Sequence, residues 1–230
     1  MKKVVFSMLI FIMIGSMGTP ILAAAEVPQQ IYEQNMELEK NKSMEAFLDM
    51  QDQITSTLKV KNEHYVYDKD EVKDIIYKFN FDDLKKNTDL NYTKETFYNE
   101  AINSIENTVL KPTFTTRNAN KYNRNHYESG WNYIRSWLDT NKAKNSIKNL
   151  YDAADVLAAG GGVGGIVGII ASGPLAPISG FLSAIGGLTA LYFTNMARNT
   201  EYKNNGTGVV LEINKFTGIY SVWSQDEYKG

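Results

Sequence analysis

Apolar positions recur with a helical period through the first half of this chain. Residues 30–58 contain neither Gly nor Pro, and their apolar positions predict one long helix or two consecutive ones. Asp68 and Thr93 are candidate N-caps, each ahead of an acidic first turn and an apolar face, and the second of these patterns runs over 92–110. Together these signals predict a charged helical region over 26–111.

The pattern changes in a polar connection at 112–126, which is rich in Asn and has no apolar period. Beyond it, Trp131, Trp137 and the apolar residues around them stand at helical spacing, and the apolar stripe continues to Leu157. We therefore expect an aromatic helix that leads into a hydrophobic helical hairpin, the two together occupying 127–200.

The predicted hairpin rests on residues 156–197, which contain no charged side chain and are bounded by Asp155 and Arg198. This length suffices for two membrane-length helices of roughly 20 residues each. A Gly-Pro-Leu-Ala-Pro sequence at 173–177 separates them. The run therefore predicts two apolar helices joined by a tight turn.

The C-terminal region, 201–230, has a different period. Two short runs at 208–214 and 219–224 are rich in β-branched residues and flank a Lys-Phe-Thr-Gly turn, which predicts a β-hairpin. A lone hairpin is marginal in water, so we expect it to pack on the helices through the side that carries Trp223, or to find a partner. The predicted fold is mainly α, a helical bundle around a hydrophobic Gly/Ala-rich helical hairpin, with a small C-terminal β-hairpin.

The N-terminus has the pattern of a secretory signal peptide over 1–25. Lys2 and Lys3 precede a short apolar run, and Ala23 and Ala25 form a small-residue cleavage site. We expect cleavage near Ala25 and a secreted, extracellular protein; the alternative is an uncleaved anchor.

Charge and cysteine content narrow the function classes. Loss of the two leading lysines reduces the 24 Lys and Arg to 22, against 26 Asp and Glu, a formal charge of −4. Nucleic-acid binding needs a basic face, so we expect no nucleic-acid partner. The chain has no Cys, which excludes a disulfide framework and a thiol nucleophile. An apolar core must therefore hold the fold.

The uncharged run is only marginally suited to a bilayer. Strong apolar residues favour insertion by about 0.3 to 0.6 kcal/mol each, whereas interior glycines weaken a helix in water by about 0.8–1 kcal/mol each. We interpret it as a conditional inserter, with a buried core hairpin or a constitutive anchor as alternatives. Glycines spaced by four also allow close helix approach in a membrane. The residues assigned to membrane insertion are Gly160, Gly164, Gly168, Ile169, Pro174, Pro177, Phe181 and Ile185.

Catalytic chemistry has little support in the sequence. His64 and His126 are the two histidines, each in a polar stretch, and neither belongs to a metal-binding or nucleophile motif. The glycine-rich stretch at 160–165 lacks the Lys and hydroxyl residue that end a phosphate-binding loop. We expect no catalytic residues, no metal, no cofactor and no enzyme activity.

The order of these segments carries a resemblance. The signal peptide, the charged helical half, the aromatic segment at 131–137, the hairpin at 156–197 and the terminal segment at 208–225 resemble the large secreted bacteriocin-like proteins of Gram-positive bacteria, of the geobacillin type. The resemblance covers mainly residues 120–225 and rests on architecture. It implies an antibacterial protein that kills related bacteria through their membrane. In layout alone the chain also resembles the pore-forming domains of colicins.

The expected function is therefore that of a secreted antibacterial protein that acts on the membrane of related bacteria by conditional insertion of the hairpin. Its partners would be the target bacterial membrane and a receptor or a second copy of the chain. The alternative is a secreted soluble interaction or adhesion module without lytic activity.

Overall fold

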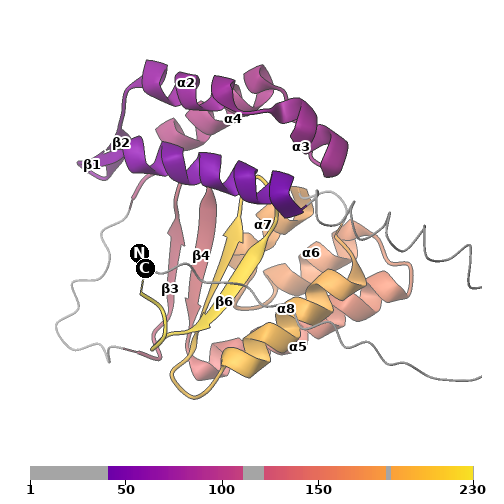
Figure 1. Ribbon diagram of the computed structural model, residues 1–230. Helices are drawn as coiled ribbons and strands as arrows, with labels where there is room; N and C mark the ends of the chain where they lie inside the picture. The colour runs from indigo at the N-terminus through magenta and orange to yellow at the C-terminus, as the bar shows by residue number, and fades with distance from the viewer. Residues whose placement is uncertain (1–40, 111–121, 185–187, 230) are drawn as a thin grey trace, which may run out of the picture.

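The computed structural model describes residues 41–110, 122–184 and 188–229. They form a mixed fold in which helices predominate and two antiparallel sheets are present, so the predicted helices with C-terminal β-structure are confirmed in part, with more strand than the sequence predicts. The predicted signal peptide and Ile185 lie outside the described residues, as does most of the polar connection. Figure 1 shows the N-terminal helices lying across one end of a central sheet, with the later helices beside it.

The N-terminal unit follows the sequence prediction closely. Residues 41–57 are helical, followed by the small hairpin of β1 (Lys59–Lys61) and β2 (His64–Val66), and then by α2 (Lys69–Lys78), α3 (Phe81–Asn87) and α4 (Lys94–Asn107). Asp68 caps α2 by accepting the backbone N–H groups of Asp70 and Glu71. Thr93 caps α4 in a capping box with Thr96. Both predicted N-caps are confirmed.

The central sheet has the order β3-β4-β5-β6, antiparallel throughout. Its strands are β3 (His126–Ser129), β4 (Tyr133–Leu138), β5 (Val209–Asn214) and β6 (Tyr220–Ser224). The two inner strands, β4 and β5, are separated in sequence by α5 (Thr140–Ala158), α6 (Val163–Ala171), α7 (Ala176–Ala184) and α8 (Ala190–Lys203). The predicted C-terminal hairpin is thus half of a larger sheet.

The predicted aromatic helix at 131–137 is wrong. Trp131 lies in the turn after β3, and the residues that follow it form β4. Ile134 and Leu138 face the helices, opposite Ile213 and Val209 of β5. Apolar side chains fill both faces of β4, so their spacing fits a helical period as well as a strand, and only pairing with distant β5 decides between them.

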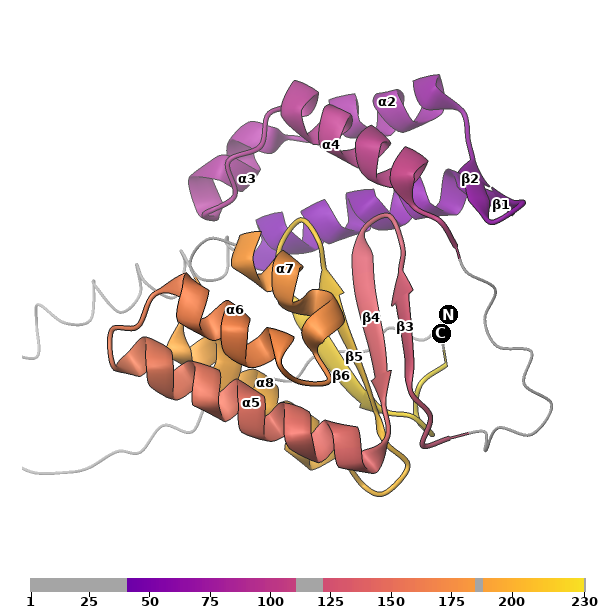
Figure 2. The same cartoon turned by 180° about the vertical axis from the view of Figure 1, so that it is seen from behind.

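Helices α5 to α8 cover one face of the sheet and form the first core (Figure 2). Alternate residues of β5, Val209, Leu211 and Ile213, are buried there. On β6 the residues that pack against this core include Val222. Trp223 points to the other face and contacts Tyr228, with 5.4 Å between the ring centroids. The prediction that the Trp223 side packs on the helices is therefore wrong. Neighbouring residues of a strand point to opposite faces, and Val222, not Trp223, faces the helices.

The second core joins the N-terminal unit to the sheet through two turns. Trp131, from the β3–β4 turn, and Phe216, from the β5–β6 turn, are buried among the N-terminal helices. Trp131 Nε1 donates to Thr55 Oγ1 at 2.9 Å, and Ser104 Oγ donates to the Trp131 carbonyl. Among the described residues, this core contains none from 156–197. The N-terminal helices therefore pack over the turns, while α5, α8 and the sheet bury only the inner side of α6 and α7.

Candidate functional site

The uncharged run 156–197 is folded into shorter pieces than the sequence predicts. It comprises the end of α5, the nine-residue helices α6 and α7, and most of α8. Nine residues span about 13 Å, less than half of an apolar bilayer core of about 30 Å. Within the described part of the chain, no helix is long and apolar enough to cross a membrane. The prediction of two membrane-length helices is therefore wrong for this folded state.

A glycine turn makes the first of these breaks. The chain leaves α5 after Ala158, and Gly160 adopts a φ of +80°, a left-handed conformation that strongly favours glycine. The chain then enters α6 at Val163. Three successive glycines at 160–162 therefore divide what the apolar pattern presents as one continuous helix.

The large apolar side chains of the hairpin point inward. Within α6, α7 and the turn that joins them, five are at most 3% exposed and pack with α5, α8 and the sheet. These five residues are Ile166, Ile170, Leu175, Ile178 and Leu182. Burial of each such side chain stabilises the fold by about 1.5–3 kcal/mol. The hairpin is therefore firmly packed while the protein is in water.

The outward face of the hairpin consists of small residues. Gly160, Gly164 and Gly168 are exposed, and a Cβ built on any of them would meet no atom within 4 Å. These three glycines therefore do not serve close packing within this chain, whereas Gly161 does, because a Cβ there would collide with Val156. Gly173 is a second contrast, because a Cβ there would collide with the Asn149 amide.

The other predicted insertion residues are not all on this face. Ile169 and Phe181 are half-buried, and Phe181 packs against the first core. Pro174 is half-buried between α6 and α7, while Pro177 is exposed in the first turn of α7. The predicted insertion residues that the structure describes thus fall into two groups. The three glycines and Pro177 are exposed, whereas Ile169, Pro174 and Phe181 are half-buried.

Polar contacts also hold residues 156–197 in place. Among the described residues, Asn149 Nδ2 of α5 donates to the Ile169 carbonyl at 3.2 Å, and Tyr192 OH of α8 donates to the Gly218 carbonyl at 2.8 Å. Burial raises the pKa of Tyr192, so its hydroxyl stays protonated as a donor. Apolar burial and the bond from Asn149 to the Ile169 carbonyl therefore act together to keep α6 and α7 against the protein.

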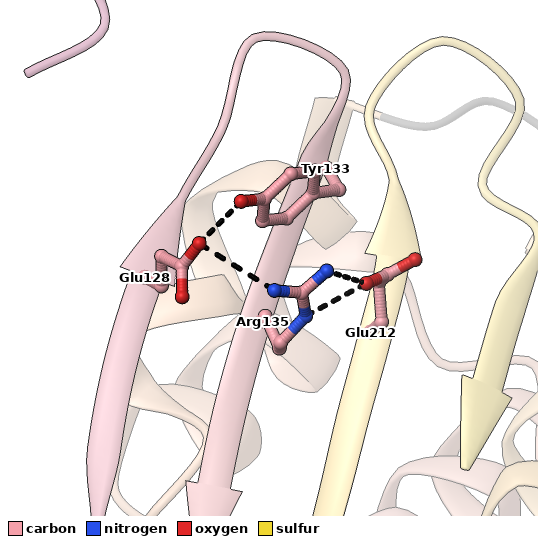
Figure 3. Close-up of polar contacts among 4 residues, drawn as sticks. All are labelled: Glu128, Tyr133, Arg135 and Glu212. Carbon is pink, nitrogen blue, oxygen red and sulfur yellow. Dashed lines mark hydrogen bonds and ion pairs between the residues drawn. The ribbon is translucent and has the colours of Figure 1, made fainter. Parts of the chain in front are cut away.

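The opposite face of the sheet carries an ionic cluster, which sequence analysis missed (Figure 3). Arg135 of β4 lies between Glu212 of β5, with Nε to Oε2 at 2.8 Å, and Glu128 of β3, with Nη1 to Oε1 at 3.4 Å. Its guanidinium is 4.1 Å from the Tyr133 ring centroid, and Tyr133 OH donates to Glu128. Strand register was the missing signal, because Arg135 pairs directly with both glutamates.

This cluster is satisfied from within. Burial acts to lower the pKa of Arg135, and the attraction and hydrogen bonds of Glu212 override it, so the pKa is raised. Burial raises the pKa of Tyr133, and the hydrogen bond to Glu128 adds to that rise. Since every charge already faces its partner, the cluster joins three strands and we assign it a structural role.

The two histidines do not meet. His64 is exposed in β2, and His126 lies in β3 with its ring centroid 5.0 Å from that of Trp137. Burial lowers the pKa of His126. Among the described residues, no three His, Asp or Glu side chains gather in a group that could hold a metal ion.

Known proteins offer no relative from which a role for these residues could be taken: the chain matches no protein-family model, no curated protein and no solved structure.

Proposed function

We propose that this chain is a secreted antibacterial protein that acts on the membrane of related bacteria by conditional insertion of residues 156–197. One observation carries the proposal: α6 and α7 present an uncharged face of small residues to solvent, Leu191 of α8 is also exposed, and the other large apolar side chains described in 156–197 are buried or half-buried. The partner would be the lipid of the target membrane. Secretion rests on the signal-peptide pattern of residues 1–25.

Lipid, but not water, can replace the packing that the hairpin loses on release. Release of residues 156–197 into water would expose the five buried side chains of α6, α7 and their turn together with Phe193 and Met196, at a cost on the order of 10–21 kcal/mol for about 1.5–3 kcal/mol each. In a bilayer the same side chains stay in an apolar medium, so most of that cost is absent. The hairpin therefore stays folded in solution and is released at a membrane.

The charge distribution supports an approach through the helical face. The N-terminal unit, residues 41–110, carries 14 Asp and Glu against 9 Lys, whereas residues 140–203 carry five Lys and Arg against three Asp and Glu. Lys142 and Lys144 are exposed on α5, the helix that packs against α6. An anionic membrane attracts each lysine by about 1 kcal/mol near its surface. The surplus of two positive charges over residues 140–203 therefore favours approach by that helical part over approach by the N-terminal unit, which has a surplus of five negative charges.

Insertion requires the broken helices to become continuous. As a single helix, residues 156–172 would span about 25 Å and residues 175–197 about 34 Å, lengths that suit a bilayer. For the first of these helices to form, the glycine turn at 160–162 must itself become helical. The rival proposal, a soluble interaction module, needs no such change and predicts no membrane damage.

The direct test uses purified residues 26–230. We expect dye release from vesicles that contain anionic lipid, and loss of membrane potential together with growth inhibition in related Gram-positive strains. Growth inhibition without depolarisation would contradict membrane action and point to a receptor or a cell-wall target. Intact vesicles and undisturbed growth would favour the soluble interaction module.

Gly160→Ala should increase vesicle permeabilisation. An alanine at φ +80° strains the folded turn by roughly 1–2 kcal/mol, and the same alanine favours a continuous helix by about 0.8–1 kcal/mol. The combined shift of about 2 kcal/mol corresponds to roughly 30-fold more of the inserted form. The dose for half-maximal dye release measures this shift.

Gly164→Ala is the matched control for that variant. Gly164 is already helical and open, so an alanine there stabilises the folded and inserted forms alike. Equal effects of the two alanines on dye release would show that the turn at Gly160 does not control insertion.

A further inference from the structure

Lys215 occupies the junction between the sheet and the N-terminal unit. It lies in the β5–β6 turn, where its Nζ donates to the Gly130 carbonyl at 2.6 Å and its backbone N–H donates to the Asn132 carbonyl at 2.8 Å. Both acceptors belong to the turn between β3 and β4. The side chain is therefore fixed by two neighbouring turns.

No carboxylate accompanies this half-buried ammonium group. Among the described residues, no Asp or Glu lies within ion-pair distance of Lys215 Nζ, and the Gly130 carbonyl is its hydrogen-bond acceptor. Burial lowers the pKa of Lys215 to about 8, and no charged group offsets that effect. At neutral pH the side chain is still mostly a cation, and it lacks a counter-charge.

Lys215 borders a hollow of about 340 Å³, the size range of small-ligand sites. The other lining residues come from the last turns of α4 and from the end of β3, and most of them carry amide or hydroxyl groups. They are Asn103, Ser104, Asn107, Thr108, Val109 and Ser129. The hollow thus has one cationic side chain in a neutral polar wall.

The end of α4 does not neutralise this cation. Three carbonyls of its last turns already accept hydrogen bonds within α4: Ser104 O accepts from Thr108 Oγ1 at 2.7 Å, and Asn103 O accepts from Asn107 Nδ2 at 2.8 Å. The Ile105 carbonyl accepts the Thr108 N–H. The negative end of the helix dipole is therefore largely satisfied within α4 itself, and the hollow remains without a counter-charge for Lys215.

We propose that this hollow binds a small polar carboxylate, about the size of a sugar acid, with Lys215 as its ionic contact. The carboxylate supplies the counter-charge, and the amides and hydroxyls of α4 and β3 hydrogen-bond the rest of the ligand. A bare phosphate would leave most of the volume to water. This site is remote in sequence from the hairpin and does not depend on the proposed membrane activity.

Calorimetric titration of the purified protein at pH 7 tests the site with three probes: glucuronate, glucose and inorganic phosphate. We expect glucuronate to bind at least about tenfold more tightly than glucose, as a charge-assisted hydrogen bond provides, and more tightly than phosphate, which leaves most of the hollow to water. Equal binding of glucose would show that charge is not recognised. Tighter binding of phosphate, or no binding of glucuronate, would overturn the proposal.

Substitutions locate the binding on the protein. Lys215→Met should weaken glucuronate binding by about tenfold or more, whereas Lys215→Arg, which keeps the charge, should retain most of it. Lys144→Met removes an exposed lysine and the same net charge, so it should leave binding unchanged. Lys215→Met also removes the hydrogen bond to the Gly130 carbonyl, so its thermal stability should fall modestly and its fold is checked by circular dichroism. Unchanged affinity in a folded Lys215→Met variant would place the ligand elsewhere.

Discussion

Gly164→Asp should abolish most vesicle permeabilisation while leaving the protein folded. Residue 164 stands at the centre of 156–172, the segment that would cross the bilayer as one helix, and a charge at that depth costs about 2.5–3.5 kcal/mol. That penalty corresponds to roughly a hundredfold lower population of the inserted form. The rate of dye release at fixed protein concentration measures it.

The folded protein should tolerate the same aspartate. A Cβ at Gly164 meets nothing within 4 Å, and the position lies in the first turn of α6, where a negative charge is favoured by about 0.3–1 kcal/mol. Gly164→Asn is the matched variant, similar in shape and uncharged, and should release dye far better than the aspartate. If both variants permeabilise vesicles like the parent chain, the hairpin does not enter the bilayer.

Trp131→Ala should produce the largest loss of stability, about 3–5 kcal/mol in the free energy of unfolding. Trp131 is fully buried, packs 5.6 Å from the Phe216 ring and donates to Thr55. In sequence it lies in the turn between β3 and β4, and its side chain is buried in the core of the N-terminal helices. We therefore expect its removal to separate unfolding of the N-terminal helices from unfolding of the sheet, as two transitions in urea followed by circular dichroism and by tryptophan fluorescence.

Trp223→Ala provides the comparison for that experiment. Trp223 is half-buried on the outer face of β6, where its ring contacts Tyr228. Its loss should be smaller and should leave a single transition. A Trp131→Ala variant that unfolds in one step, with no more lost stability than Trp223→Ala, would contradict the coupling role of Trp131.

Local chemistry made the N-terminal helices predictable. The Asp68 and Thr93 caps act within a few residues of themselves, so the sequence alone locates the starts of α2 and α4. The strands of the C-terminal hairpin were predictable for the same reason, because a short turn joins them. Helix capping and hairpin turns need no information from distant parts of the chain.

Long-range pairing decided the rest. Strand β4 has apolar residues on both faces, and its identity depends on β5, about 70 residues later. The Arg135 cluster could not be found without that register, since its members come from three strands. The glycines of 160–168 suggested close packing in the sequence, yet Gly160, Gly164 and Gly168 face solvent. Their spacing alone could not show on which side the partner helices lie.

The pairing of β4 with β5 constrains the route by which the hairpin could leave. Leu138 at the end of β4 stands opposite Val209 at the start of β5, so both ends of the intervening segment emerge at the same end of the sheet. While those hydrogen bonds persist, both ends of the segment stay attached to the sheet, so the segment can leave the protein only as a loop. It must therefore cross a bilayer an even number of times, and the sheet stays on the side from which it entered.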